Sequence, residues 1–258
     1  MGNTLPRVNV IGMGEVGRRL ADALLRAGIE TKEVTRDHGW PQALQDHDGL
    51  YLVCVREEVL RKVLERIGPG ASDRIILVQN GWIRPEIRDF PNVTRGLIWF
   101  TAKGEFFRVP RPSPFAGPWA VVLAAALSAG DLPSLAVDSA AFDRLDAEKM
   151  GLNCVIGLPL AVHGLSLGEY LEEAPEEARE VFREAVSVCA SALGAETGTN
   201  LWEEFIRVAA PLDWVRVGRA KALEFRNGAV VALAEKLGHE APVNAGLLRE
   251  YTSRDLPS

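Results

Sequence analysis

A six-residue glycine pattern near the start of the chain, GMGEVG at residues 12–17, most constrains how it can fold. Before it stand residues 7–11, RVNVI, which predict a short buried β-strand. After it, residues 16–27 carry apolar side chains at helical spacing, and Gly28 follows where a C-cap glycine is expected. A glycine pattern between a strand and a helix predicts the first β-α unit of a parallel sheet.

Each of the three glycines has its own physical requirement. Gly12 permits the tight turn, Gly14 lets the backbone approach a pyrophosphate, and Gly17 lets helix and strand pack closely. The phosphates then lie against N–H groups at the helix N-terminus. A tight turn without a ligand is the alternative. We expect dinucleotide binding here, through Gly12, Met13, Gly14, Glu15, Val16 and Gly17.

The rest of the first half also alternates strand and helix signals. Further strands are predicted over residues 30–34, 50–55, 74–78 and 93–100, with a surface helix over 57–67. Residues 103–118 predict loops or edge strands, followed by a helix at 121–127 and a strand at 135–138. This alternation is typical of an α/β fold, a Rossmann-like doubly wound parallel sheet with helices on its faces.

From about residue 143 the pattern is helical almost to the end. Helices are predicted over residues 144–162, 175–193, 201–208, 212–237 and 244–251. We therefore expect two domains, a Rossmann domain over residues 1–140 that binds the nucleotide and an all-helical C-terminal domain over residues 141–258 that serves substrate binding and dimerisation.

Composition excludes several functions. With 29 Lys and Arg against 35 Asp and Glu in 258 residues, the net charge of −6 argues against a nucleic-acid partner. The longest apolar run, residues 119–127, is too short to span a membrane, and no signal segment is visible. Cysteines at 54, 154 and 189 lie far apart, and the four histidines form no ligand pair. We expect a cytoplasmic protein without a metal.

The choice between NAD and NADP depends on the end of the second strand. An NAD site places a carboxylate there for the ribose hydroxyl, whereas an NADP site uses cations for the 2′-phosphate. Arg36 lies just past that strand, and Arg56 ends the third. Both guanidinium groups favour NADP. Glu33 and Asp37 are carboxylates near the same strand end, so NAD remains an alternative. Either arginine could also be a solvated surface charge.

Five segments together resemble the ketopantoate reductase (2-dehydropantoate 2-reductase) family. The first is the glycine turn together with Arg36, and the second is Arg56 at the end of the third strand. The other three are QNGW at residues 79–82, EKMGLNCVIGLPLAV at 148–162, and EFRNGAVV with LGHEAPVN over 224–244. They follow the family's order along most of the chain. The resemblance implies a Rossmann domain, a helical domain and an active site between them.

The resemblance also implies roles for individual residues. Lys149 matches the catalytic lysine, which gives a proton or hydrogen bond to the carbonyl oxygen that receives negative charge. Asn80 matches an asparagine near the nicotinamide and the substrate. Asn153, four residues after Lys149, matches a substrate-contacting asparagine on the same helical face. A solvated lysine and a plain Asn-Gly turn are the alternatives from the residues alone.

At two positions in the helical domain, the sequence differs from the family pattern. Gly157 stands where the family has a second asparagine on the lysine helix, and Ala222 where it has a substrate-site glutamate. Arg207, Arg216 and Lys221 are available for an anionic substrate, although no motif assigns them.

The resemblance implies an NADPH-dependent reductase that converts a small, ketopantoate-like 2-keto acid into a 2-hydroxy acid, and a homodimer is possible. The alternatives are an NADP-dependent imine (pyrroline-carboxylate-like) or β-hydroxyacid oxidoreductase, and an NADP-binding protein that has lost catalysis.

Overall fold

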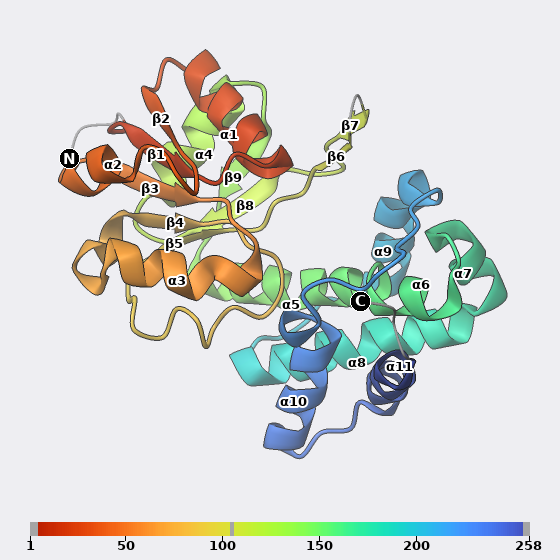
Figure 1. Cartoon of the computed structure of the whole chain (residues 1–258). Helices are drawn as coiled ribbons and strands as arrows, with labels where there is room; N and C mark the ends of the chain where they lie inside the picture. The colour runs from red at the N-terminus through yellow and green to blue at the C-terminus, as the bar shows by residue number, and fades with distance from the viewer. Residues whose placement is uncertain (1–4, 104–105, 255–258) are drawn as a thin grey trace. The chain divides into compact units, whose positions relative to one another are not determined.

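The computed structural model describes residues 5–103 and 106–254 (Figure 1). The chain divides into two compact units between Phe142 and Asp143. Within the described residues, the model contains no helix with both the length and the apolar character needed to cross a membrane.

The first unit is built on a seven-stranded sheet in the order β2-β1-β3-β4-β5-β8-β9. Its elements are β1 (Val8–Ile11), α1 (Glu15–Arg26), β2 (Thr31–Val34), α2 (Trp40–Gln45), β3 (Leu50–Val53), α3 (Glu57–Ile67), the 3₁₀ helix η1 (Pro69–Arg74), β4 (Ile75–Leu77), β5 (Thr94–Gly96), β6 (Thr101–Lys103), β7 (Phe106–Arg108), β8 (Ser113–Ala116), α4 (Ala120–Ala129) and β9 (Ser134–Ala136). Strands β1 to β5 are parallel, β8 runs antiparallel to β5, and β9 is parallel to β8.

The order of the strands confirms the doubly wound sheet. From β1 the chain builds outward through β2 on one side and through β3 and β4 on the other. In such sheets ligands bind beyond the carboxyl ends of the strands, where the winding reverses. In this chain, that point lies at the end of β1.

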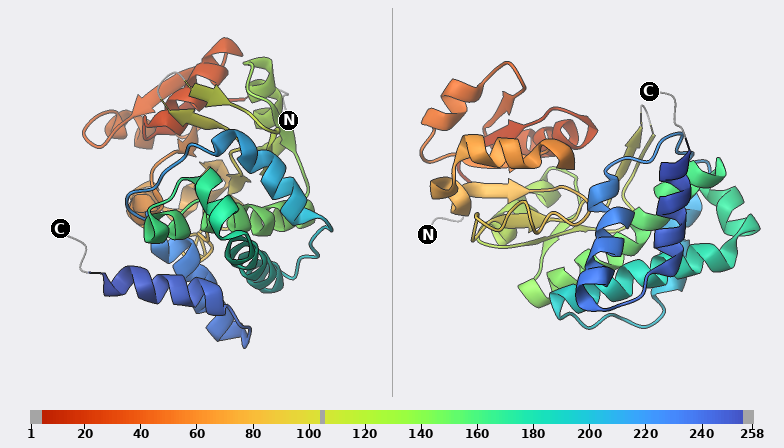
Figure 2. Two further views of the ribbon diagram at one scale, coloured as in Figure 1. Left: turned by 90° about the vertical axis from the view of Figure 1, so that its right-hand side faces the viewer. Right: turned by 60° about the horizontal axis from the view of Figure 1, so that its bottom comes forward.

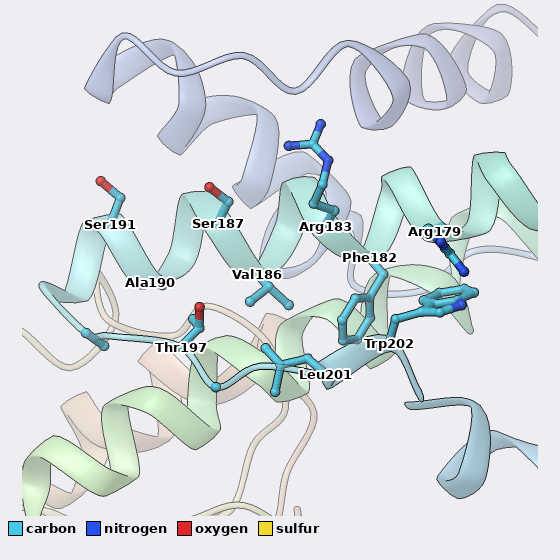
Figure 3. A pocket seen from close by; sticks show the side chains of 12 residues that line it. Arg179, Phe182, Arg183, Val186, Ser187, Ala190, Ser191, Thr197, Leu201 and Trp202 are labelled. Atoms are coloured by element: carbon cyan, nitrogen blue, oxygen red, sulfur yellow. The ribbon is translucent and has the colours of Figure 1, made fainter. Parts of the chain in front are cut away.

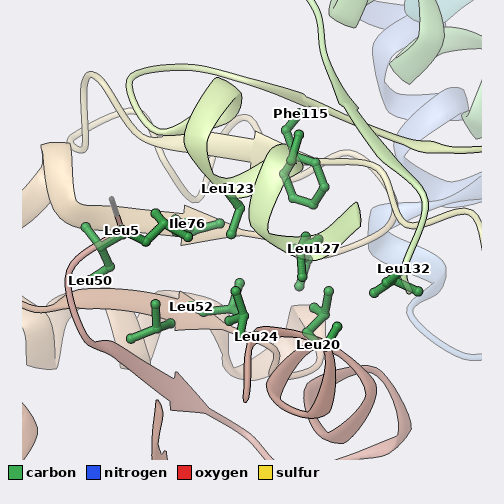
Figure 4. Close-up of a cluster of buried hydrophobic side chains, with 14 of the residues drawn as sticks. Leu5, Leu20, Leu24, Leu50, Leu52, Ile76, Phe115, Leu123, Leu127 and Leu132 are labelled. Atoms are coloured by element: carbon green, nitrogen blue, oxygen red, sulfur yellow. The ribbon is translucent and has the colours of Figure 1, made fainter. Parts of the chain in front are cut away.

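A large apolar core fixes α1 and α4 on the sheet. Leu20 and Leu24 of α1 and Leu123 and Leu127 of α4 pack with alternate strand residues, among them Leu50, Leu52, Ile76 and Phe115 (Figure 4). The intervening residues Tyr51, Val53 and Ile75 project to the other face and are also buried. Both faces of the sheet are thus covered, as a parallel sheet requires.

Several predictions for this unit were imprecise. The strand expected over 93–100 is limited to β5, and α2 was not anticipated. Residues 103–118 were expected to form loops or edge strands, but β8 lies inside the sheet between β5 and β9. Its sequence, SPFA, is short and contains a proline, so its strand signal was weak.

The second unit is helical. Its elements are α5 (Ser139–Val155), which begins in the first unit, α6 (Leu158–His163), α7 (Leu167–Glu173), α8 (Pro175–Leu193), α9 (Leu201–Ala209), the short 3₁₀ helices η2 (Ala210–Leu212) and η3 (Leu223–Phe225), α10 (Asn227–Leu237) and α11 (Pro242–Ser253) (Figure 2). Helix α8 packs against α7, α9, α10 and α11.

Two helix predictions in this unit were wrong. The helix expected over 144–162 is divided at Gly157, where φ is −117° and ψ is −99°. Pro159 explains the division, because its ring clashes with a helical carbonyl four residues earlier. The helix expected over 212–237 begins only at Asn227. Before it, the chain runs along α7, where the Leu167 N–H donates to Val215 O (2.9 Å).

A buried polar cluster joins four helices of the second unit. Glu184 of α8 is 1% exposed, and its carboxylate accepts from the backbone N–H groups of Val243 and Asn244, both at 2.9 Å, at the start of α11. The Asn244 amide donates to the same carboxylate at 2.8 Å. Asn227 of α10 donates to Asn244 Oδ1 (2.9 Å) and to the Cys154 carbonyl of α5 (3.2 Å).

Candidate functional site

The carboxyl ends of four neighbouring strands bring the predicted cofactor residues to one edge of the sheet. Ile11 of β1 pairs with Val34 of β2 and Val53 of β3, and Val53 pairs with Leu77 of β4. The residues just beyond these ends form what we call the strand-end site. They are residues 12–17, Arg36, Arg56, Gln79 and Asn80.

The glycine turn has the geometry that its sequence requires. Gly12 has a φ of +97°, and its N–H donates to Val34 O at 2.9 Å, so the turn is tied to β2. A Cβ on Gly17 would lie 2.0 Å from the Gly12 carbonyl oxygen, and only a glycine fits there. A Cβ on Gly14, by contrast, would meet nothing within 4 Å. Space therefore lies over Gly14, at the start of α1.

The N-terminus of α1 is open to a ligand. Gly14 and Glu15 are exposed, and no side chain caps the helix. Met13 and Val16 pack against the apolar core, and these contacts hold the turn on the sheet. Backbone N–H groups at an uncapped helix start, together with the helix dipole, attract a phosphate. The described residues therefore fit the pyrophosphate of a dinucleotide.

Two arginines stand at the strand ends on either side of β1. Arg36 follows β2, and Arg56 follows β3 as the N-cap residue of α3. Both are exposed, and neither forms an ion pair with any residue that the structure describes. Glu33 lies inside β2, opposite Val10 of β1, rather than beyond the strand end. Both guanidinium groups are therefore available to a phosphate here.

Gln79 and Asn80 complete this edge. The Gln79 side chain is buried and donates to the carbonyls of Val53 (2.8 Å) and Val55 (3.1 Å), which ties the end of β4 to that of β3. Gly81, with a φ of +84°, then turns the chain, and Asn80 is half-buried. No role was predicted for Gln79 from the sequence, although this residue begins the QNGW motif.

Lys149 and Asn153 lie on α5 in the second unit. Their four-residue separation places them on one face of the helix, and the two residues are 4% and 8% exposed. A lysine this buried differs from the solvated surface lysine that a single helix position usually predicts.

Arg226 lies next to the end of the same helix. A Cβ on Gly157 would lie 4.0 Å from Arg226 Nη1 and 3.8 Å from Asn227 Oδ1. Arg226 Nε and Asn227 Oδ1 are both buried without a hydrogen-bond partner in the described parts of the chain. Burial raises the pKa of the neighbouring Cys154 thiol to about 12, and the charge of Arg226 opposes that rise. No sequence motif assigns a role to Arg226, although it lies within EFRNG.

The other cations considered for an anionic substrate are placed differently. Arg216 binds the Glu169 carboxylate at 2.6 Å and the Gly164 carbonyl at 2.9 Å, so it fixes the segment before α10 to α7. Arg207 and Lys221 are exposed. Ala222, where the resemblance expects a glutamate, is buried with a φ of 51°.

No metal centre is evident in residues 5–103 and 106–254, where no three His, Cys, Asp or Glu side chains group together. Cys54, Cys154 and Cys189 are free thiols, and burial raises the pKa of each.

A cavity of about 470 Å³ lies between α8 and the segment leading into α9 (Figure 3). Phe182, Val186, Leu201 and Trp202 give it an apolar lining. Arg183 at its rim is paired with Glu180. None of the predicted site residues lines this cavity.

Comparisons with known proteins find the fold in solved structures. No family model matches the chain, and no curated protein matches it either. A PanE/ApbA family ketopantoate reductase from Ralstonia eutropha JMP134 superposes with a TM-score of 0.78 at 19% identity, over 96% of this chain and 97% of that one. D-mandelate dehydrogenase in complex with NADH gives 0.73 at 17% identity, over 96% and 98%. A dimeric ketopantoate reductase from Staphylococcus aureus gives 0.74 at 17% identity, over 95% and 99%. The chain therefore has the fold of the ketopantoate reductases, a Rossmann-like sheet followed by helices, in a sequence far diverged from theirs.

Proposed function

We propose that the protein is an NADPH-dependent reductase of a small 2-keto acid. The observation that carries the proposal is the strand-end site, an uncapped helix N-terminus with open space over Gly14, beside two exposed arginines without ion-pair partners in the described residues. The fold adds support, since its solved neighbours include ketopantoate reductases and a D-mandelate dehydrogenase with NADH.

In this proposal residues 12–17 hold the pyrophosphate, and Arg36 and Arg56 bind the 2′-phosphate that distinguishes NADPH from NADH. Arginine suits this task, because its planar fork binds phosphate oxygens in pairs. Asn80, at the end of β4, orients the nicotinamide end of the cofactor.

When bound, the reduced nicotinamide supplies a hydride to the carbonyl carbon of the substrate. The carbonyl oxygen then gains an electron pair, and Lys149 donates the proton that turns it into a hydroxyl group. Before that transfer, the Lys149 ammonium stabilises the negative charge that develops on the oxygen. Asn153, on the same face of α5, hydrogen-bonds the substrate and orients it.

The proposal is tested by the rate of NADPH oxidation with a panel of 2-keto acids. We expect Lys149→Ala to lower kcat by roughly 10²- to 10⁴-fold, because the proton donor is lost, while the Kd of NADPH stays unchanged. Lys236→Ala serves as the control, since that lysine is exposed on α10. Unchanged turnover in Lys149→Ala would reject the assignment of the proton donor.

Ala222 favours a second candidate, reduction of a cyclic imine, because its methyl group cannot take the part of a substrate-site glutamate. Turnover of a pyrroline carboxylate but of no 2-keto acid would support it. Tight NADPH binding without turnover of either class would indicate a binding protein that has lost catalysis.

Two further proposals concern the whole protein. A homodimer is supported by the dimeric neighbour from Staphylococcus aureus. A cytoplasmic location is supported by the three free thiols, which a reducing compartment preserves.

A further inference from the structure

One cavity of the second unit lies apart from the residues assigned so far. It has a volume of about 470 Å³ and lies between α8 and the segment that leads into α9 (Figure 3). Sites for small molecules typically measure roughly 300–1,000 Å³ and combine an apolar lining with a few polar groups. All the lining residues fall between Arg179 and Trp202, so this cavity, which we call the α8 cavity, belongs to one compact unit.

One wall of the α8 cavity is aromatic. The rings of Trp202 and Phe182 meet edge to face with their centroids 5.7 Å apart. The Phe205 ring packs on both, at 5.0 Å from Trp202 and 5.2 Å from Phe182. Phe182 and Phe205 are buried, whereas Trp202 is only partly buried. An indole that is fixed by two buried rings and still accessible offers a flat apolar surface on which another planar ring can stack.

Both walls of the cavity are fixed by contacts within the unit. Phe182 and Val186 pack on α5 at Gly151, where a Cβ would lie 2.6 Å from the phenyl ring and 2.7 Å from Val186 Cγ2. On the other side, the Ala195 N–H donates to Ala190 O (2.9 Å), which ties the chain that leaves α8 to the last turn of that helix. A ligand therefore finds the space already formed, as is usual for small-molecule sites.

A cation stands at the mouth of the cavity. The Arg179 guanidinium carbon lies 5.6 Å from the centroid of the Trp202 ring, and Figure 3 shows the two side chains next to each other. Arg179 is exposed, and no salt bridge or side-chain hydrogen bond joins it to any residue that the structure describes. The adjacent Glu180 carboxylate binds Arg183 instead, at 2.6 Å. The Arg179 charge is therefore available to an anion that lies against the indole.

These features together indicate the chemistry of the ligand. A planar apolar body with one anionic group matches both the aromatic wall and the guanidinium. A polyanion such as a nucleotide would bring phosphates against the apolar wall, at a large desolvation cost. We propose that the α8 cavity binds a small aromatic carboxylate, with its ring stacked on Trp202 and its carboxylate paired with Arg179. This inference does not rest on the proposed reductase function, because none of the residues given a role there lines the cavity.

The test titrates three compounds into the protein by calorimetry. They are 2-naphthoate, which has the proposed chemistry, 2-naphthamide, its neutral counterpart of nearly the same shape, and acetate, which lacks the ring. We expect 2-naphthoate to bind at least about threefold more tightly than 2-naphthamide, as one charge-assisted contact at an exposed arginine predicts. Acetate should bind more weakly than either, because it buries no ring.

Two variants locate the binding. Arg179→Gln should remove the preference for the carboxylate and leave the Kd of 2-naphthamide unchanged. Ala195→Phe adds a ring to the lining of the cavity and should weaken the binding of both naphthalene compounds at least about tenfold, since the ring occupies the same space. Arg249→Gln is the matched control for the charge, because Arg249 is exposed on α11 and does not line the cavity. Urea unfolding checks that each variant is folded.

The inference predicts the same Kd of 2-naphthoate with and without saturating NADPH. It would be overturned if 2-naphthoate did not bind, if 2-naphthamide bound equally well, or if the preference survived in Arg179→Gln. A Kd of 2-naphthoate that rises in proportion to added NADPH would place the ligand at the strand-end site and overturn it as well. Failure to reduce any 2-keto acid would count against the proposed reductase function alone and leave the α8 cavity as a binding site.

Discussion

Within the glycine turn, the structure separates a glycine that packing requires from one that faces open space. Gly17 is required by packing, since a side chain there would meet the Gly12 carbonyl, whereas Gly14 faces open space. The two glycines look alike in the sequence, but only Gly17 is required by the packing of the fold.

We expect Gly17→Ala to lower the free energy of unfolding by about 3 kcal/mol, because its Cβ would overlap backbone that cannot move freely. Gly14→Ala should cost less than about 1 kcal/mol, the usual effect at a helix N-cap, yet weaken NADPH binding at least tenfold. Urea unfolding and NADPH fluorescence titration measure the two effects. Full NADPH affinity in a folded Gly14→Ala protein would contradict the proposed approach of the pyrophosphate.

Arg36 carries the prediction about cofactor choice. Removing a charged hydrogen-bonding partner costs about 1.5–3 kcal/mol, so Arg36→Ala should weaken NADPH binding by roughly ten- to a hundredfold. NADH affinity should hardly change. Lys32→Ala is the control, because this lysine is exposed on β2 before the strand end. Equal losses for NADPH and NADH would show that Arg36 does not recognise the 2′-phosphate.

Residues whose surroundings come from neighbouring positions in the sequence could be predicted. Residues that contact segments far away in the sequence could not. The glycine turn is recognisable because strand, turn and helix are consecutive. Gln79 and Arg226 are different, since Gln79 binds the end of another strand and Arg226 lies beside Gly157, far away in the sequence. No local pattern marks either contact.

Among the secondary-structure elements, the strands made of consecutive apolar residues were predicted best. The buried strands β3 and β4 are apolar runs, which is typical of parallel strands covered on both faces. The helical spacing of apolar residues gave wrong helix boundaries where the spacing continues across a break in the helix. It joined α5 to α6 although the chain breaks at Gly157, just before Pro159, and it extended α10 back over a segment that hydrogen-bonds to α7.

Among the helices, α8 and α11 depend on one buried carboxylate. Glu184→Gln replaces an acceptor oxygen by an amide group and leaves an N–H at the start of α11 without a partner. We expect the free energy of unfolding to fall by about 1–3 kcal/mol, measured by urea unfolding. Glu180→Gln, on the exposed face of the same helix, should change it by less than about 0.5 kcal/mol. Equal effects would mean that Glu184 does not hold the two helices together.

At the scale of the whole molecule, the chain combines a nucleotide-binding type of sheet with a helical unit that carries a buried lysine. The sequence motifs indicated both parts in the correct order, and the solved structures confirm the fold. The substrate could not be predicted in the same way, because Gly157 and Ala222 depart from the family pattern. Only the folded chain shows that Arg226 lies beside the first of them.

The most direct test of the proposed reductase follows the hydrogen itself. The protein is incubated with a 2-keto acid and NADPH that carries deuterium at the transferable position of C4, and the product is analysed by mass spectrometry. The proposal predicts a 2-hydroxy acid with a single deuterium on the former carbonyl carbon, formed in equal amount to the NADPH oxidised. NADPH that binds but transfers no deuterium to any 2-keto acid would contradict it.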